Sequence, residues 1–294
     1  MKYYAINAKV AGMGAKLLSD EDYLSLSGAR TAHEAMKLLK SHETYAYLDN
    51  DWTSISAQTF LLLEDDYDKI SGFINDTNIK KYLKNLLAKR RMVLLKRELR
   101  AAYSGGKDAS TVIEGLEGDT FHDFLKSTIK LGAPLSQIEI LLELNYYTSL
   151  WKARSRYLSG ADKDAMTLIN GTEIDMYNLA RILGLKKHYK SSCEQMYKYV
   201  LPINYKVAPQ AIQQLIEADS EAQMRELIKN TPYGEYFHAG NTAEGFRRAI
   251  SDANRRAVRK NPDSIAKITR YLHRKEAEVS KIISVMETIN YARR

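Results

Sequence analysis

Residues 18–48 of this chain, LSDEDYLSLSGARTAHEAMKLLKSHETYAYL, decide its fold because they recur 189 positions later as residues 207–237, VAPQAIQQLIEADSEAQMRELIKNTPYGEYF. The shared positions are mostly apolar, as where Leu39 pairs with Ile228, and they carry no catalytic group. The same pairing predicts that Tyr47-Leu48 and Tyr236-Phe237 occupy equivalent places. Internal repeats of this kind build stacked or ring-like assemblies of similar units. The first inference is therefore a scaffold.

A shorter third copy lies between the two. Residues 124–128, FLKST, resemble residues 227–231, LIKNT. The middle unit matches least well, since the aromatic residue expected after Ser127-Thr128 does not follow.

Long helical patterns separate the copies. Apolar residues recur at spacings of three, four and seven in residues 76–103 and keep to one face in residues 264–292, as in amphipathic helices. Three long helices also echo one another, since Ile79, Leu179 and Ile268 stand 100 and then 89 positions apart. Turns are expected where Gly and Pro gather, including Gly171-Thr172. Each of the three long helices is expected to begin near an aspartate. The aspartates are Asp76, Asp175 and Asp263.

The fold class predicted from these patterns is all-α, because no alternating strand pattern occurs and the chain has only 5 Pro and 15 Gly. The order of the elements predicts three similar helical lobes arranged as a ring. Their expected bounds are 1–75, 76–165 and 166–262, and the C-terminal helix, 263–294, is available to complete the first lobe.

Composition places the chain among ordinary globular proteins, with 45% hydrophobic and 27% charged residues in 294. No apolar run approaches the roughly 20 residues that cross a bilayer. The first residues lack the apolar core of a signal peptide. A single cysteine, Cys193, excludes an internal disulfide and favours a reducing compartment. We therefore expect a location on the cytoplasmic side, with Cys193 as a buried small residue of a helix rather than a nucleophile.

Positive charge is concentrated in two stretches. Residues 245–294 carry the whole net charge of +8, and residues 80–100 hold nine basic groups against Glu98 alone. Such patches attract nucleic acid, acidic membrane surfaces or acidic protein partners, although long helices also carry solvated Lys and Arg. Nucleic-acid binding has no motif to support it here. The candidate partner-contact residues are the densest group, Arg247, Arg248, Arg255, Arg256, Arg259 and Lys260.

Sites for catalysis, cofactors and metals are not expected. Gly12–Lys16 lacks the spacing of a phosphate-binding loop, because Lys16 is followed by Leu17. The acidic run Glu64–Asp68 is better explained as a solvated helix face or turn than as a cation site. The histidines lack metal-ligand spacing. They are His33, His42, His122, His188, His238 and His273.

The repeats also resemble a known family in their order and spacing. The motifs are Gly12-Met13-x-x-Lys16-Leu17-Leu18, Asp22-Tyr23-x-x-Leu26, Glu34-Ala35, Leu38-Leu39, Tyr45-x-x-Leu48, Glu173-Ile174-Asp175-x-x-Asn178-Leu179, Thr231-Pro232-Tyr233-Gly234 and Tyr271-Leu272-x-x-Lys275-Glu276-x-Glu278-Val279. Over essentially the full length they are similar to the C-type subunit of the V/A-type rotary ATPases (ATP synthases), which is known as d in the eukaryotic vacuolar enzyme.

That resemblance implies a funnel-shaped, pseudo-threefold protein without an active site of its own. It implies a peripheral place on the cytoplasmic face of the membrane, one copy per complex, between the central-shaft subunits and the ion-carrying rotor ring. Torque passing through such a central-stalk protein serves ATP-coupled H⁺ or Na⁺ transport. The alternative is a basic helical scaffold that binds nucleic acid.

Overall fold

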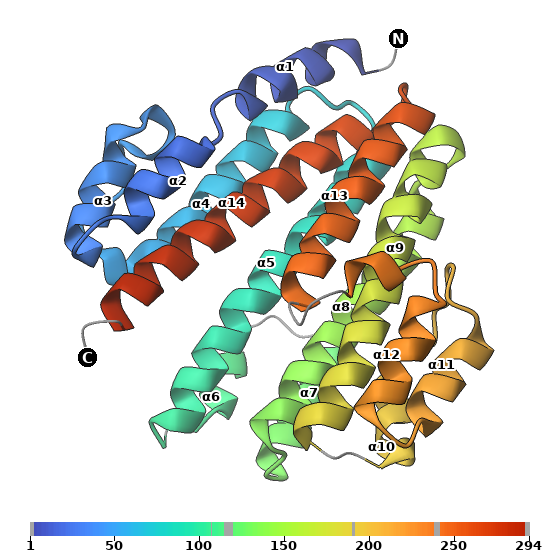
Figure 1. Ribbon diagram of the computed structural model, residues 1–294. Helices are drawn as coiled ribbons and strands as arrows, with labels where there is room; N and C mark the ends of the chain where they lie inside the picture. The colour runs from blue at the N-terminus through green and yellow to red at the C-terminus, as the bar shows by residue number, and fades with distance from the viewer. Residues whose placement is uncertain (1–2, 107, 115–119, 190–191, 238–241, 292–294) are drawn as a thin grey trace. The chain divides into compact units, whose positions relative to one another are not determined.

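The computed structural model describes residues 3–106, 108–114, 120–189, 192–237 and 242–291, and every regular element in these ranges is helical (Figure 1). The predicted all-α fold class is therefore confirmed. The α-helices are α1 (Tyr4–Gly14), α2 (Asp20–Ser27), α3 (Ala32–Ser41), α4 (Ile55–Ser71), α5 (Thr77–Ser104), α6 (Ser110–Glu114), α7 (Thr120–Lys130), α8 (Leu135–Tyr157), α9 (Gly160–Gly184), α10 (Cys193–Lys198), α11 (Pro209–Glu217), α12 (Glu221–Lys229), α13 (Thr242–Lys260) and α14 (Ala266–Tyr291). Short 3₁₀ turns are η1 (Glu43–Tyr45), η2 (Trp52–Ser54) and η4 (Gly234–Tyr236), and η3 (Leu185–Tyr189) is a π-helical turn.

The chain forms two compact units. Unit 1 combines residues 1–80 with residues 267–294, and unit 2 comprises residues 81–266. Within unit 1, the C-terminal helix α14 contributes Ile282 and Met286 to the same core as Leu26 and Leu39 of the N-terminal hairpin. The bounds of three separate lobes, and their arrangement as a funnel-shaped ring, stay predictions.

Helices α2 and α3 form a hairpin in unit 1 whose ends are set by capping. The Thr31 hydroxyl accepts the backbone N–H of Glu34 at 3.0 Å, and the Glu34 carboxylate accepts the N–H of Arg30 at 2.7 Å. These bonds satisfy N–H groups that the first turn of a helix otherwise leaves unpaired. Figure 1 shows the hairpin beside the C-terminal half of α14.

Helices α11 and α12 in unit 2 repeat this hairpin at the same offset. Ser220 and Gln223, 189 positions after Thr31 and Glu34, make the same two capping bonds: the Ser220 hydroxyl accepts the N–H of Gln223 at 3.2 Å, and Gln223 accepts the N–H of Asp219 at 2.9 Å. Leu215 and Ile228 are buried like Leu26 and Leu39. The sequence repeat is therefore a repeat of local structure.

One detail of the predicted pairing is wrong. Tyr47 is 95% exposed, whereas Tyr236 is 3% exposed and resembles Tyr45, which is fully buried. Tyr45 ends η1 as Tyr236 ends η4. Four residues separate α12 from η4, whereas only His42 separates α3 from η1, so η4 lies two residues beyond the position that the 189-residue offset gives.

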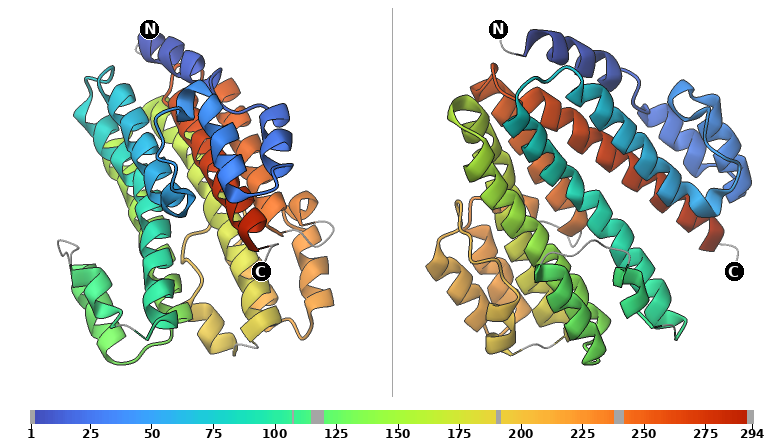
Figure 2. Two further views of the ribbon diagram at one scale, coloured as in Figure 1. Left: turned by 90° about the vertical axis from the view of Figure 1, so that its left-hand side faces the viewer. Right: turned by 180° about the vertical axis from the view of Figure 1, so that it is seen from behind.

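The third copy falls on a further hairpin, α6 and α7. Leu125 of α7 is fully buried with Ile113 of α6, in a core that also takes Leu99 from α5 and Ile138 from α8. Each of the three hairpins thus packs on a long helix: α14, α5 or α9. Figure 2 shows α5 and α8 running side by side in unit 2.

The three long helices exist as predicted, but one start is wrong. Ile79, Leu179 and Ile268 are all buried, and Asp76 caps α5 through the N–H of Asn78 at 2.9 Å. Helix α9, however, begins at Gly160 and runs straight through the turn expected at Gly171-Thr172. A Cβ on Gly171 would lie 2.3 Å from the Tyr205 ring, so glycine serves close packing here and not a turn.

Two buried carboxylates hold hairpins in place by the same device. In unit 1, Glu278 of α14 accepts the N–H of Leu18 at 2.5 Å and the hydroxyl of Tyr45. In unit 2, Asp175 of α9 accepts the N–H of Val207 at 3.2 Å and the hydroxyl of Tyr233 at 3.0 Å.

Leu18 and Val207 are partners in the 189-residue repeat, so both hairpins are tied at the same point. Asp175 also accepts the N–H groups of Tyr205 and Lys206. Burial raises the pKa of the Asp175 carboxyl, while these hydrogen bonds act in the opposite direction.

Candidate functional site

Helix α13 carries all six predicted partner-contact residues, and its small residues explain how it presents them. Gly245, Ala249, Ala253 and Ala257 recur every four residues and are buried, so this face packs closely on the rest of unit 2, chiefly on α9. Long basic side chains occupy the remaining faces. The sequence therefore determines which side of α13 is charged.

The six basic residues fall into two groups. Arg247 pairs with Glu244 of its own helix at 2.5 Å, and Lys260 lies exposed at the C-terminal end. The other four, Arg248, Arg255, Arg256 and Arg259, gather around Tyr236 of η4. We call the recess between them the arginine recess. Its volume is about 360 Å³, and it is lined by Glu235, Tyr236, Asp252, Arg255, Arg256 and Arg259.

Tyr236 is held rigidly at the floor of the arginine recess. Its hydroxyl donates to Asp252 Oδ2 at 2.9 Å and accepts from Arg256 Nη2 at 3.3 Å, and the Arg248 guanidinium lies 5.9 Å from its ring centroid. Burial, together with the hydrogen bond to Asp252, raises the pKa of Tyr236 to about 12. Sequence reasoning missed Tyr236 as part of this site, because the mismatched register paired it with the exposed Tyr47.

Within the described residues, some charged groups in the arginine recess are paired with one another, and Arg259 is not. Asp252 is fully engaged, since Tyr236 occupies one of its oxygens and Arg255 the other. Arg259 has no ion-pair partner in the part of the chain that the structure describes. Arginine guanidinium groups suit carboxylate and phosphate oxygens. The arrangement can therefore bind an anionic group.

The second basic stretch, residues 80–100, is largely engaged inside unit 2. Lys89 pairs with Glu173 of α9 at 2.6 Å, and Lys96 with Glu143 of α8 at 2.5 Å. Arg100 pairs with Glu139 at 2.5 Å. These ion pairs join α5 to α8 and α9, so this stretch serves packing more than it serves a partner surface.

Lys96 should make the free energy of unfolding depend on pH in the alkaline range. Its Glu143 partner is shared with Arg181, and burial lowers the pKa of the Lys96 ammonium to about 8 from 10.5. Between pH 8 and 10.5 the unfolded chain then binds more protons at this site than the folded one, so stability rises with pH. Between pH 8 and 10.5 the free energy of unfolding of the parent protein should rise by on the order of 1–3 kcal/mol relative to that of Lys96→Met, as measured by urea unfolding. If the difference in free energy of unfolding between the two proteins does not change with pH, the pKa of Lys96 is not lowered.

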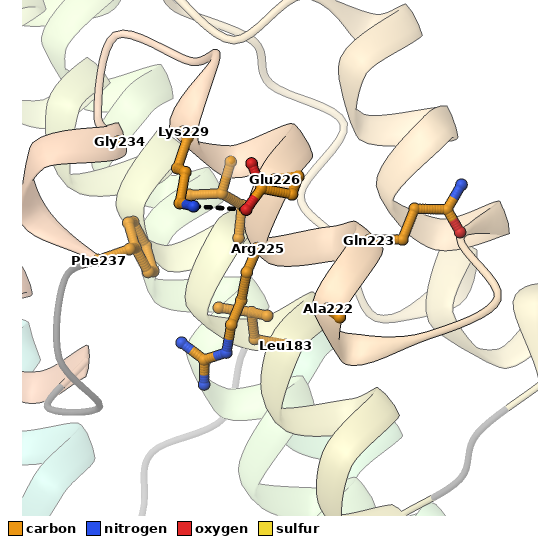
Figure 3. A pocket seen from close by; sticks show the side chains of 9 residues that line it. Leu183, Ala222, Gln223, Arg225, Glu226, Lys229, Gly234 and Phe237 are labelled. Carbon is orange, nitrogen blue, oxygen red and sulfur yellow. Dashed lines mark hydrogen bonds and ion pairs between the residues drawn. The ribbon is translucent and has the colours of Figure 1, made fainter.

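A second recess, of about 460 Å³, lies where α12 meets the end of α9 (Figure 3). Leu183 and Phe237 provide its apolar lining, and Lys229 is paired with Glu226 at its rim. Arg225 is paired with Glu221 at 2.5 Å. Because its cations are already neutralised, this recess is a weaker candidate than the arginine recess.

The other sequence candidates have structural roles. Asp66 of the acidic run accepts the hydroxyl of Tyr271 at 2.5 Å, and Lys16 pairs with Glu43. Cys193 is exposed at the start of α10, so the expectation of a buried residue is wrong; Ser192 caps the helix and leaves its first residue outside. No group of three or more His, Cys, Asp or Glu suited to a metal ion occurs among the described residues, although His188 and His238 lie outside those whose side chains are described.

Within the described ranges, no helix is long and apolar enough to span a membrane. The fold and the site together define a class: an all-helical protein built from repeated hairpins, with an arginine-rich recess on its surface. The family model of the ATP synthase (C/AC39) subunit matches residues 6–127 and 106–294. The chain belongs to this family. No curated protein matches the chain.

Proposed function

We propose that this chain is the central-stalk coupling subunit of a V/A-type rotary ATPase or ATP synthase. It acts as a non-catalytic socket that links the rotating central shaft to the membrane rotor ring. The torque it transmits serves ATP-coupled H⁺ or Na⁺ transport. The observation that carries the proposal is the match to the ATP synthase (C/AC39) subunit family, which extends over residues 6–294.

The internal structure suits a torque-bearing part. Closely packed interiors resist compression. Each hairpin packs on a long helix, and two of them are tied by buried carboxylates, Glu278 and Asp175. A coupler with these ties deforms little under load. In the complex it lies at the periphery of the membrane's cytoplasmic face, in one copy, with no nucleic acid bound.

A pull-down from detergent-solubilised membranes tests this function. The tagged chain should recover nucleotide-binding head subunits together with the ion-carrying ring, and the isolated chain should hydrolyse no ATP. Recovery of nucleic acid in place of a membrane ATPase, with affinity falling steeply as salt rises, would instead favour the nucleic-acid-binding scaffold.

The basic segment Arg247–Lys260 is the proposed contact with an acidic partner surface or with membrane headgroups. Arg255→Glu combined with Arg259→Glu should weaken rebinding to complexes depleted of this protein and flatten its dependence on salt. These two side chains are exposed, whereas Arg256 is half-buried and its guanidinium bonds to Tyr236. Rebinding is measured by sedimentation at several salt concentrations.

The matched control places the same charge change on the other basic stretch. Lys84→Glu with Arg97→Glu alters two exposed residues of α5. If both double variants lose affinity equally, the effect is one of net charge and the contact is not on α13. Unchanged affinity and salt dependence in the α13 variant would also contradict a contact through α13.

A further inference from the structure

The arginine recess extends along one face of α13. Arg255 and Arg259 follow Arg248 by seven and eleven residues, spacings that place all three on the same side of a helix. Over that span the stripe is about 16 Å long. Asp252, four residues after Arg248, lies within this stripe, and Glu235 of η4 borders it. The face therefore alternates in sign.

This alternation bears on what the face can bind. A membrane of anionic lipids or a nucleic-acid backbone presents negative charge at close, regular intervals. Either would bring its own charges against Asp252 and Glu235, at a cost in repulsion. Discrete carboxylates on a protein segment can meet the arginines and leave the two acids uncovered. Mixed charges of this kind give specificity for one partner.

We infer that the arginine recess binds an acidic segment of a protein partner, with a carboxylate of that segment on Arg259 and the neighbouring Arg255. This inference rests on the proposed function, because it assigns a partner class to the contact on α13. Tyr236 helps to hold three of the arginines: its hydroxyl bonds to Arg256 and to Asp252, which pairs with Arg255, and its ring faces Arg248, while Arg259 is left for a ligand. Preorganised guanidinium groups lose less freedom on binding than free ones.

Site-specific photo-crosslinking tests the inference. Ser251 is exposed on α13, between Arg248 and Arg255, and does not line the recess. A benzoylphenylalanine at this position is introduced into the full chain, which is assembled into the detergent-solubilised complex and irradiated. Mass spectrometry then identifies what was captured. We expect one protein segment rich in Asp and Glu, and Arg259→Ala should lower its yield about tenfold, the loss of one charge-assisted contact.

Three results would overturn the inference. They are capture of lipid or nucleic acid, capture of a segment without acidic residues, and absence of any crosslink in an assembled complex. Failure of the proposed function has a different signature, because the chain would then not assemble with a membrane ATPase at all. Arg97→Ala on α5 is the matched control and should leave the yield unchanged.

Discussion

Lys275→Met is expected to destabilise unit 1 by about 3 kcal/mol, because it leaves a buried carboxylate without its cation. Lys275 and Glu278 of α14 are 1% and 3% exposed and lie 2.8 Å apart. The Lys275 ammonium also donates to the Tyr45 hydroxyl at 2.8 Å. The pair thus joins the C-terminal helix to the turn that follows the first hairpin. Urea unfolding measures the loss, and hydrogen exchange should quicken in α3 and α14.

The matched control removes an exposed lysine of the same unit. Lys16 pairs with Glu43 across 27 residues, but the two side chains are 57% and 75% exposed. Exposed pairs contribute little to stability. Lys16→Met should therefore leave the unfolding curve unchanged. If Lys275→Met behaves like Lys16→Met, the buried pair does not hold the C-terminal helix to the hairpin.

Gly245→Ala is expected to have a similarly large effect, in unit 2. A Cβ on this residue would lie 1.7 Å from the backbone oxygen of Tyr236. The clash is with backbone, so no side-chain rotation relieves it, and η4 must move away from α13. We expect a loss of about 3 kcal/mol, as for severe overpacking. Because η4 carries Tyr236, the floor of the arginine recess should be lost with it.

Gly184→Ala is the control for this prediction, since a Cβ there would meet nothing within 4 Å. Alanine is the better helix former, so stability should stay level or rise slightly. Hydrogen exchange of α13 and η4 distinguishes the two variants. Equal stability of Gly245→Ala and the parent protein would contradict the close packing of η4 on α13.

Much of this fold could be predicted from sequence because the repeat is periodic in apolar residues. Leu26, Leu39, Leu215 and Ile228 mark the hairpins, and all four are buried. Capping residues at equivalent positions, such as Thr31 and Ser220, reinforce the same register. Patterns of this kind act locally, so a single sequence suffices to find them.

What sequence reasoning missed depends on contacts between distant residues. Gly171 suggested a turn, but it serves the close approach of Tyr205 to α9. Asp175 suggested a helix start, yet its buried carboxylate accepts three N–H groups of residues 205–207. The arginine recess likewise needed Tyr236, whose place is set by Gly245. None of these pairings leaves a local signature in the chain.

The most direct test of the coupling function compares ATP hydrolysis with ATP-driven ion uptake in membrane vesicles that lack this protein. Hydrolysis by the head should persist while uptake of the coupling ion is lost, and adding the purified chain should restore uptake. Ion uptake at the normal rate in vesicles without the chain would contradict the account.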